Sequence, residues 1–246
     1  MKILFSPSEA KYRGGINKPI ESKNYIFPEL FGKRLEILKR YQDYIDNSSK
    51  EQLMKLFGTK KEDIVDYYSS DIFARETQKV IERYDGVAYD YLDYSSLDDI
   101  QKRYIEKNTL IFSNLFGAIL AGDKGLPDYK LKQGEKIGDL ALEKFYKEHF
   151  TPSIDKFLED EDCLDLRAGF YTKFYKPSKN YTTLKFIKDG KVVSHWAKAY
   201  RGVVLRHLAI YNIDSVEELL DTTIEKLSIK DINIKGFHQE VIYEIN

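Results

Sequence analysis

Residues 1–11 read Met-Lys-Ile-Leu-Phe-Ser-Pro-Ser-Glu-Ala-Lys, and this stretch predicts where the fold begins. The apolar run Lys2–Phe5 predicts a β-strand that ends at Ser6-Pro7, because proline has no N–H to donate to a strand ladder. The loop that follows carries Ser6 and Lys11. One positive charge and three apolar residues are too few for a secretory signal, so we expect this strand to open the folded domain directly.

A second apolar run lies at residues 110–117, Leu-Ile-Phe-Ser-Asn-Leu-Phe-Gly. It predicts a buried strand whose carboxyl end opens into a loop through Ser113 and Asn114. Ligands often bind at the carboxyl ends of strands in open sheets. Ser113 and Asn114 are therefore candidate site-lining residues.

Helical and extended patterns alternate along the rest of the chain. Helices are predicted at residues 28–45, 50–57, 61–68, 73–84, 138–150 and 198–211, with a new helix starting at Thr151-Pro152. The Asp-Gly pair at residues 189–190 predicts a hairpin within residues 181–196, and further strands are expected at 163–166 and 241–245. We predict an α+β fold, a single compact domain over residues 1–246 with a mixed central sheet surrounded by helices.

Composition excludes several classes of site. The single cysteine, Cys163, excludes an internal disulfide and any multi-cysteine metal site, and it favours a reducing compartment. His195 and His238 are candidate acids or bases, although a lone histidine is more often structural, and none of the four histidines has metal-ligand spacing. We predict no metal site and no cofactor. The longest apolar stretch, residues 109–122, is broken by polar residues and glycines, so no membrane span is expected.

The charge is distributed unevenly along the chain. The net charge is −1, but residues 164–206 hold ten basic residues against two acidic ones, a net +8, which leaves −9 for the remainder. Aromatic residues are interleaved with these cations, as in proteins that bind nucleic acid. Lys198 and Arg201 are three residues apart near a predicted helix start, a spacing that puts both on one face. The alternative is that these lysines form only the solvated outer face of half-buried strands.

Short motifs spread over almost the full length resemble those of the peroxide stress protein YaaA family. They occur in the family's order. The matching residues are Ser6, Pro7 and Lys11; Tyr84, Gly86 and Tyr89; Ser113, Leu115, Phe116 and Gly117; Pro127, Tyr129 and Leu131; Asp165, Leu166, Tyr171 and Lys173; and Lys198, Arg201, Gly202 and Arg206.

The resemblance implies a cytoplasmic bacterial protein that helps cells survive hydrogen peroxide by limiting iron-driven damage to DNA and protein. It also implies DNA binding, one compact α+β domain with a positively charged cleft, and a helix-hairpin-helix element. Residues 50–57, the turn 58–60 and residues 61–68 are the candidate for that element, and an ordinary helix pair is the alternative.

Three functional hypotheses follow. The first is a DNA-binding stress protein that contacts duplex phosphates through Ser6, Lys11, Lys173, Lys198, Arg201 and Arg206, with little base specificity because no base-reading helix is evident. The second is an enzyme acting on a nucleotide, nucleobase or phosphorylated small molecule. There Lys11 or Lys198 would be an activated amine or an anion clamp, and Asp165 an acid or base. Asp165 and Tyr171 are further candidate site-lining residues. The third is a protein-interaction module. The sequence leaves open whether the protein is an enzyme.

Overall fold

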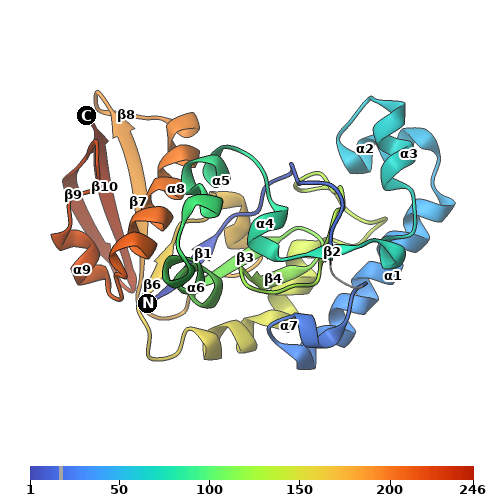
Figure 1. Cartoon of the computed structure of the whole chain (residues 1–246), viewed down its shortest axis with the longest axis horizontal. Coiled ribbons are helices and arrows are strands. Elements are labelled where there is room, and N and C mark those ends of the chain that lie inside the picture. The colour runs from blue at the N-terminus through green and yellow to red at the C-terminus, as the bar shows by residue number, and fades with distance from the viewer. Residues whose placement is uncertain (17–18) are drawn as a thin grey trace.

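The computed structural model describes the backbone of residues 1–16 and 19–246 (Figure 1). The side chains of Ser194 and His195 are not among those that the structure describes. The prediction that His195 is an acid or base therefore falls outside the described residues. The predicted α+β fold around a mixed sheet is confirmed. The extent of the single domain, residues 1–246, stays a prediction.

Strand β1 (Lys2–Phe5) lies inside the main sheet, whose order is β4-β3-β1-β6-β7-β10-β9, with β8 added beside β7. The other strands are β3 (Thr109–Ser113), β4 (Gly117–Leu120), β6 (Cys163–Asp165), β7 (Tyr181–Lys188), β8 (Lys191–Val192), β9 (Leu227–Lys235) and β10 (His238–Ile245). β1 pairs in parallel with both β3 and β6, and β7 pairs in parallel with β6 and β10. β4, β8 and β9 pair antiparallel. A separate two-stranded sheet joins β2 (Thr77–Gln78) to β5 (Leu126–Pro127).

The connections from two neighbouring strands diverge. After β1 the chain next enters the main sheet at β3, on one side of β1, whereas β6 lies on the other side and leads on to β7. The loops after β1 and β6 therefore leave the sheet in opposite directions. Such a topological switch point opens a crevice at the carboxyl ends of the strands, where α/β proteins commonly bind ligands.

The helices surround this sheet unevenly. Figure 1 shows α1, α2 and α3 at one end of the molecule and the β9–β10 hairpin at the other. The helices are α1 (Phe31–Asn47), α2 (Lys50–Phe57), α3 (Glu62–Tyr68), α4 (Val80–Arg83), α5 (Val87–Leu92), α6 (Asp99–Asn108), α7 (Leu142–Phe157), α8 (Ser194–Tyr211) and α9 (Val216–Asp221). α5 packs closely against α8, which also packs on α6 and β7.

The pair α2 and α3 occupies the position of the expected helix-hairpin-helix element. α2 begins with a capping box at Ser49 and ends at Gly58, whose φ of 64° lies in the left-handed region. The N–H groups of Gly58 and Thr59 donate to the carbonyl oxygens of Lys55 and Met54. These N–H groups are used inside the turn, and the assignment of a helix-hairpin-helix element, as opposed to an ordinary helix pair, stays a prediction.

Three predicted helices differ in the structure. Residues 73–84 form no continuous helix, because Thr77 pairs with Pro127 in the small sheet and only α4 is helical beyond it. The helix expected at 138–150 begins at Leu142 and runs through Pro152 without a restart, since proline removes one hydrogen bond from the helix but does not end it here. α8 starts at Ser194, so Trp196 belongs to the helix and not to the hairpin.

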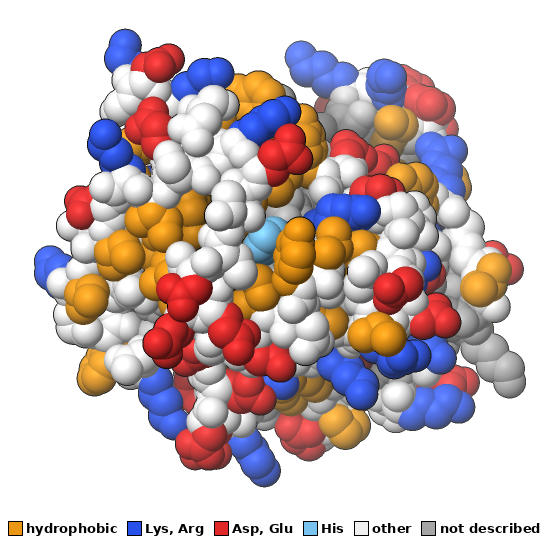
Figure 2. Space-filling view, turned by 60° about the vertical axis from the view of Figure 1, so that its left-hand side comes forward, with side chains coloured by type: hydrophobic (Ala, Val, Ile, Leu, Met, Phe, Trp, Pro, Cys, Tyr) orange, Lys and Arg blue, Asp and Glu red, His pale blue; other side chains and the backbone are white. Residues whose placement is uncertain are grey.

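The carboxyl-terminal hairpin was only half predicted. The strand expected at 241–245 is confirmed and is longer, starting at His238, but its partner β9 was missed. Every residue of β9 after Leu227 is exposed. Its apolar residues alternate with polar ones only over two short runs, 227–229 and 232–234, because the pairing register shifts between them, opposite Ile242 and Tyr243. Figure 2, which brings this side forward, shows hydrophobic side chains exposed among charged ones.

Gly202 is required where α8 crosses α5. A Cβ at this position would collide with the backbone carbonyl oxygen of Ala88, which no side-chain rotation can relieve. We predict that Gly202→Ala lowers the free energy of unfolding by roughly 1–3 kcal/mol. Urea denaturation measures this. Gly32→Ala is the matched control, because Gly32 lies in α1 with no atom within 4 Å of the position that a Cβ would take, and it should gain up to about 1 kcal/mol. Equal effects of the two substitutions would contradict the assigned packing.

Candidate functional site

A cavity of about 380 Å³ lies at the carboxyl ends of β1 and β6. Five parts of the chain contribute to it: the loop after β1, the start of α5, the segment between β5 and α7, the segment after β6, and α8. Its lining residues are Phe5, Ser6, Pro7, Ser8, Glu9, Gly86, Val87, Ala88, Tyr89, Gln133, Ala168, Tyr171, Lys198 and Arg201. We call this cavity the switch-point pocket.

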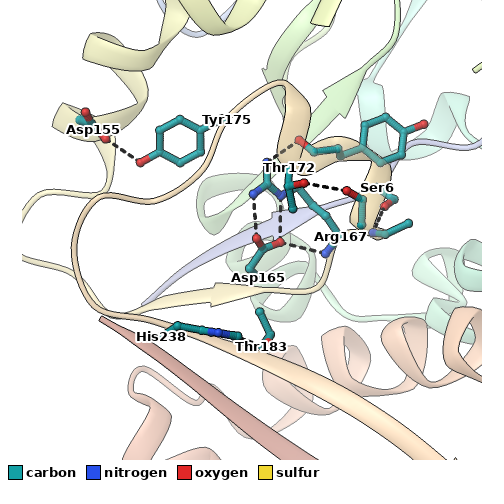
Figure 3. A network of polar contacts seen from close by, with 11 residues as sticks. Ser6, Asp155, Asp165, Arg167, Thr172, Tyr175, Thr183 and His238 are labelled. Atoms are coloured by element: carbon teal, nitrogen blue, oxygen red, sulfur yellow. Dashed lines mark hydrogen bonds and ion pairs between the residues drawn. The ribbon is translucent and has the colours of Figure 1, made fainter. Parts of the chain in front are cut away.

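Hydrogen bonds hold the loop after β1 in place. The Ser6 hydroxyl oxygen accepts from the backbone N–H of Ala168 at 2.8 Å, which ties the loops after β1 and β6 together (Figure 3). The Tyr89 hydroxyl donates to the Ser6 carbonyl oxygen at 2.9 Å. The Glu9 carboxylate accepts from the N–H of Gln133 at 3.1 Å. The lining segments are therefore fixed to one another by bonds that do not depend on a ligand.

A buried ion pair lies at the end of β6. Arg167 donates to both carboxylate oxygens of Asp165, with Nε to Oδ1 at 2.8 Å and Nη2 to Oδ2 at 2.7 Å (Figure 3). The backbone N–H of Arg167 also donates to Oδ1, at 3.0 Å. Both residues are 6% exposed, and neither lines the pocket. Asp165 is therefore engaged in holding the turn after β6.

Arg201 brings a charge that is incompletely compensated. It lies on α8 in the pocket wall, is partly buried, and burial lowers the pKa of its guanidinium, which the charge of Asp165 opposes. Within the described part of the chain Arg201 makes no hydrogen bond or ion pair. Both carboxylate oxygens of Asp165, the carboxylate whose charge acts on Arg201, accept hydrogen bonds from Arg167. Lys198, one turn earlier and exposed, is likewise unpaired among the described residues. Against these two cations the pocket wall offers one carboxylate, Glu9.

Lys11 lies next to the pocket but does not line it. Its ammonium donates to the carbonyl oxygens of Ser8 and Glu9 at 3.2 and 3.3 Å, and lies 4.1 Å from the Tyr129 ring centre and 5.4 Å from that of Tyr84. Burial lowers the pKa of Lys11 to about 7, an effect that the charge of Asp128 opposes. Around pH 7 a large share of Lys11 side chains is therefore neutral.

The structure gathers only some of the predicted site residues. Ser6, Tyr171, Lys198 and Arg201 line the pocket together, although they are almost 200 residues apart in sequence. Lys173 is exposed over the Phe170 ring, and Arg206 donates to the carbonyl oxygens of Leu92 and Asp93. These two lie outside the pocket.

Ser113 and Asn114 are also buried away from the pocket lining. The Ser113 hydroxyl is 2.7 Å from the Tyr129 hydroxyl, and the Asn114 amide donates to the Leu131 carbonyl oxygen at 3.4 Å. The Asn114 Oδ1 atom is buried without a hydrogen-bond partner among the described residues. Tyr129 links this buried polar group to Lys11, because its hydroxyl contacts Ser113 and its ring lies under the Lys11 ammonium.

Several pocket residues were not singled out by the sequence. Glu9 and Gln133 contribute from irregular segments that have no periodic pattern, so only the fold brings them in. Gly86 was part of the family motif, and its role is now visible: its φ is 120°, and a Cβ would lie 2.9 Å from the Ser8 hydroxyl. That glycine lets the start of α5 approach the loop after β1.

Other expected features are placed by the structure. His238 stacks on Tyr181, with ring centres 4.7 Å apart, and its Nε2 is 2.7 Å from the Thr183 hydroxyl. Cys163 is buried, and burial raises the pKa of its thiol. In the described residues no three His, Cys, Asp or Glu side chains group in a way that could hold a metal ion, and no helix there is long and apolar enough to cross a membrane.

Comparison with known proteins gives a consistent result. A family model described as peroxide stress protein YaaA matches residues 1–232. An uncharacterized protein of Campylobacter jejuni is 50% identical over 245 residues, covering 100% of this chain and 99% of the relative. A UPF0246 protein of Fusobacterium nucleatum is 30% identical over 95% of both chains, and one of Corynebacterium glutamicum is 33% identical over 85% of both.

The ion pair at the end of β6 gives a stability prediction. Asp165→Asn leaves the buried Arg167 guanidinium without a compensating charge, and we expect the free energy of unfolding to fall by about 3–5 kcal/mol. Denaturant unfolding monitored by tyrosine fluorescence and circular dichroism measures this. Lys185→Ala, which removes a partly exposed pair with Glu240 at 3.9 Å, should cost no more than about 1 kcal/mol. A loss for Asp165→Asn as small as that control would show that the pair does not hold the turn.

Proposed function

The chain belongs to the peroxide stress protein YaaA family, and from that premise we propose that it binds DNA phosphates at the switch-point pocket as part of a peroxide stress response. In this proposal the protein works in the cytoplasm and limits iron-driven damage by occupying DNA. The family membership supports the stress-related role. The geometry of the pocket supports the binding mode.

The incompletely compensated charge of Arg201 carries the proposal. A partly buried guanidinium that lacks a hydrogen-bonded anion is unfavourable unless a ligand supplies one. Lys198 adds a second cation on the same wall, and the pocket has only Glu9 to offset them. Phosphate oxygens match a guanidinium in charge and geometry, since arginine can donate two parallel hydrogen bonds to them.

The surrounding surface favours binding without base specificity. Phosphate contacts contribute affinity but carry no sequence information. Lys198 and Arg201 reach the pocket from the first turns of α8, which also packs along α5 and β7, so the helix is not available to enter a DNA groove. We therefore expect duplexes of different sequence to bind with similar affinity.

The double variant Lys198→Ala/Arg201→Ala tests the binding site. Removing two phosphate contacts should weaken binding of a labelled duplex about tenfold or more at low salt, and should flatten the slope of log K against log salt by about 1.8. Fluorescence anisotropy over a salt series measures both quantities.

Lys188→Ala/Lys191→Ala is the matched control for that experiment. It removes the same charge from the same basic segment, but both lysines lie on the β7–β8 hairpin outside the pocket. We expect a smaller loss of affinity from this pair. An equal loss in both double variants would mean that net charge, not the pocket, determines DNA binding.

A second candidate function rests on Lys11. An amine that is about half neutral near pH 7 can act as a nucleophile or a base, as a desolvated lysine does in Schiff-base enzymes. The aromatic rings of Tyr84 and Tyr129 and the carbonyl oxygens of Ser8 and Glu9 hold the side chain beside the pocket. This arrangement favours an enzyme that acts on a nucleotide or another phosphorylated small molecule bound in the pocket.

Labelling of amines tests the state of Lys11. Its reductive methylation should titrate with a midpoint near pH 7, whereas a free lysine side chain has a pKa of about 10.4. Peptide mapping by mass spectrometry after short labelling pulses, from about pH 6 to about pH 11.5 so that the free-lysine range is covered, follows each lysine separately. The midpoint does not depend on how accessible the amine is. A Lys11 midpoint in the range of the free side chain would remove the support for this function.

A further inference from the structure

The switch-point pocket is too small for a double helix. Its volume of about 380 Å³ is near the lower end of the roughly 300–1,000 Å³ typical of small-molecule sites. A double helix is far larger than such a molecule, since the major groove of B-DNA alone is about 12 Å wide. A duplex can therefore reach only the rim of this pocket, and whatever enters it has the dimensions of a single small molecule.

The pocket has an apolar floor and a charged rim. Phe5, Tyr89 and Tyr171 are buried, at 1%, 8% and 5% exposure, and line the deep part. Lys198 and Glu9 are exposed at the opening, with Arg201 partly buried beside them. Aromatic and apolar groups suit the flat face of a base, and the cations suit its phosphate. Near the rim, the Gln133 side-chain amide offers both a donor and an acceptor to polar edges.

We propose that the switch-point pocket holds one unstacked nucleotide, with its phosphate against Lys198 and Arg201 and its base over Tyr89 and Tyr171. This deepens the proposed function and rests on it, because it names the part of DNA that enters the site. The same chemistry is offered by a nucleotide extruded from DNA and by a free mononucleotide.

An extruded nucleotide makes the affinity depend on DNA structure. Turning a nucleotide out of a duplex costs unstacking and unpairing free energy, and the cost is smallest when the base is already unpaired. The protein should therefore bind a duplex with one bulged nucleotide more tightly than the perfect duplex of the same sequence. We expect a difference of about tenfold.

The test uses the full chain and three probes: a perfect duplex, the same duplex with a single bulged 2-aminopurine, and dAMP. We expect tighter binding of the bulged duplex by anisotropy, a rise in 2-aminopurine fluorescence as the base leaves the stack, and competition by dAMP for both. Direct binding of dAMP, measured by isothermal titration calorimetry, without binding of either DNA probe would retain the one-nucleotide pocket, assign it to a free nucleotide, and overturn the DNA function.

Variants that fill the pocket separate insertion from contact at the rim. Ala168→Phe and Val87→Phe enlarge two lining side chains that are partly exposed, and they leave Lys198 and Arg201 in place. We expect either variant to abolish the preference for the bulge and the fluorescence rise while duplex binding persists. Val192→Phe, at an exposed position of β8 outside the pocket, is the control, and thermal unfolding verifies that each variant is folded.

The outcomes distinguish this inference from the proposed function. If DNA binding requires Lys198 and Arg201, but the bulge is not preferred and the filled variants behave like the wild type, phosphate binding stands and the nucleotide pocket is wrong. If duplex and bulged DNA both bind the Lys198→Ala/Arg201→Ala variant as tightly as the wild type, the proposed function itself fails.

Discussion

Parallel pairing of β1 with β3 on one side and β6 on the other is the constraint on which the rest of the structure depends. It makes the loops after β1 and β6 diverge, and the hydrogen bond from Ala168 to the Ser6 hydroxyl fixes the distance between them. The ion pair of Arg167 with Asp165 then holds the turn after β6 from inside. With both loops fixed, α8 can place Lys198 and Arg201 across the crevice without any contribution from a ligand.

The electrostatics of the pocket follow from how the fold divides the basic segment. Of its ten cations, Arg167 is neutralised by a buried carboxylate, Arg206 is bonded to the end of α5, and Lys185 pairs with Glu240. Lys198 and Arg201 are the two that line the pocket. A chain with a net charge of −1 thus presents a local excess of positive charge at the switch-point pocket, where Lys198 and Arg201 face one carboxylate, Glu9.

Much of the fold could be predicted from local pattern, and the exceptions have physical causes. The strand at Lys2–Phe5, the hairpin turn at Asp-Gly and the buried strand before Ser113 each have a strong local signal. In β9 a register shift divides the alternating pattern into two runs too short to be recognised, and residues 73–84 lost their helix to pairing with Pro127. In the site, Lys198 and Arg201 were found from their charge and helical spacing. Glu9 and Gln133 were not, because only tertiary structure brings irregular segments to a pocket.

The most direct measurement of the central claim is a crystal structure of the protein grown with a short DNA oligonucleotide. The account predicts a DNA phosphate within hydrogen-bond distance of the Arg201 guanidinium and the Lys198 ammonium, between the loop after β1 and α8. DNA seated on another face, with neither Lys198 nor Arg201 in contact with a phosphate, would contradict it.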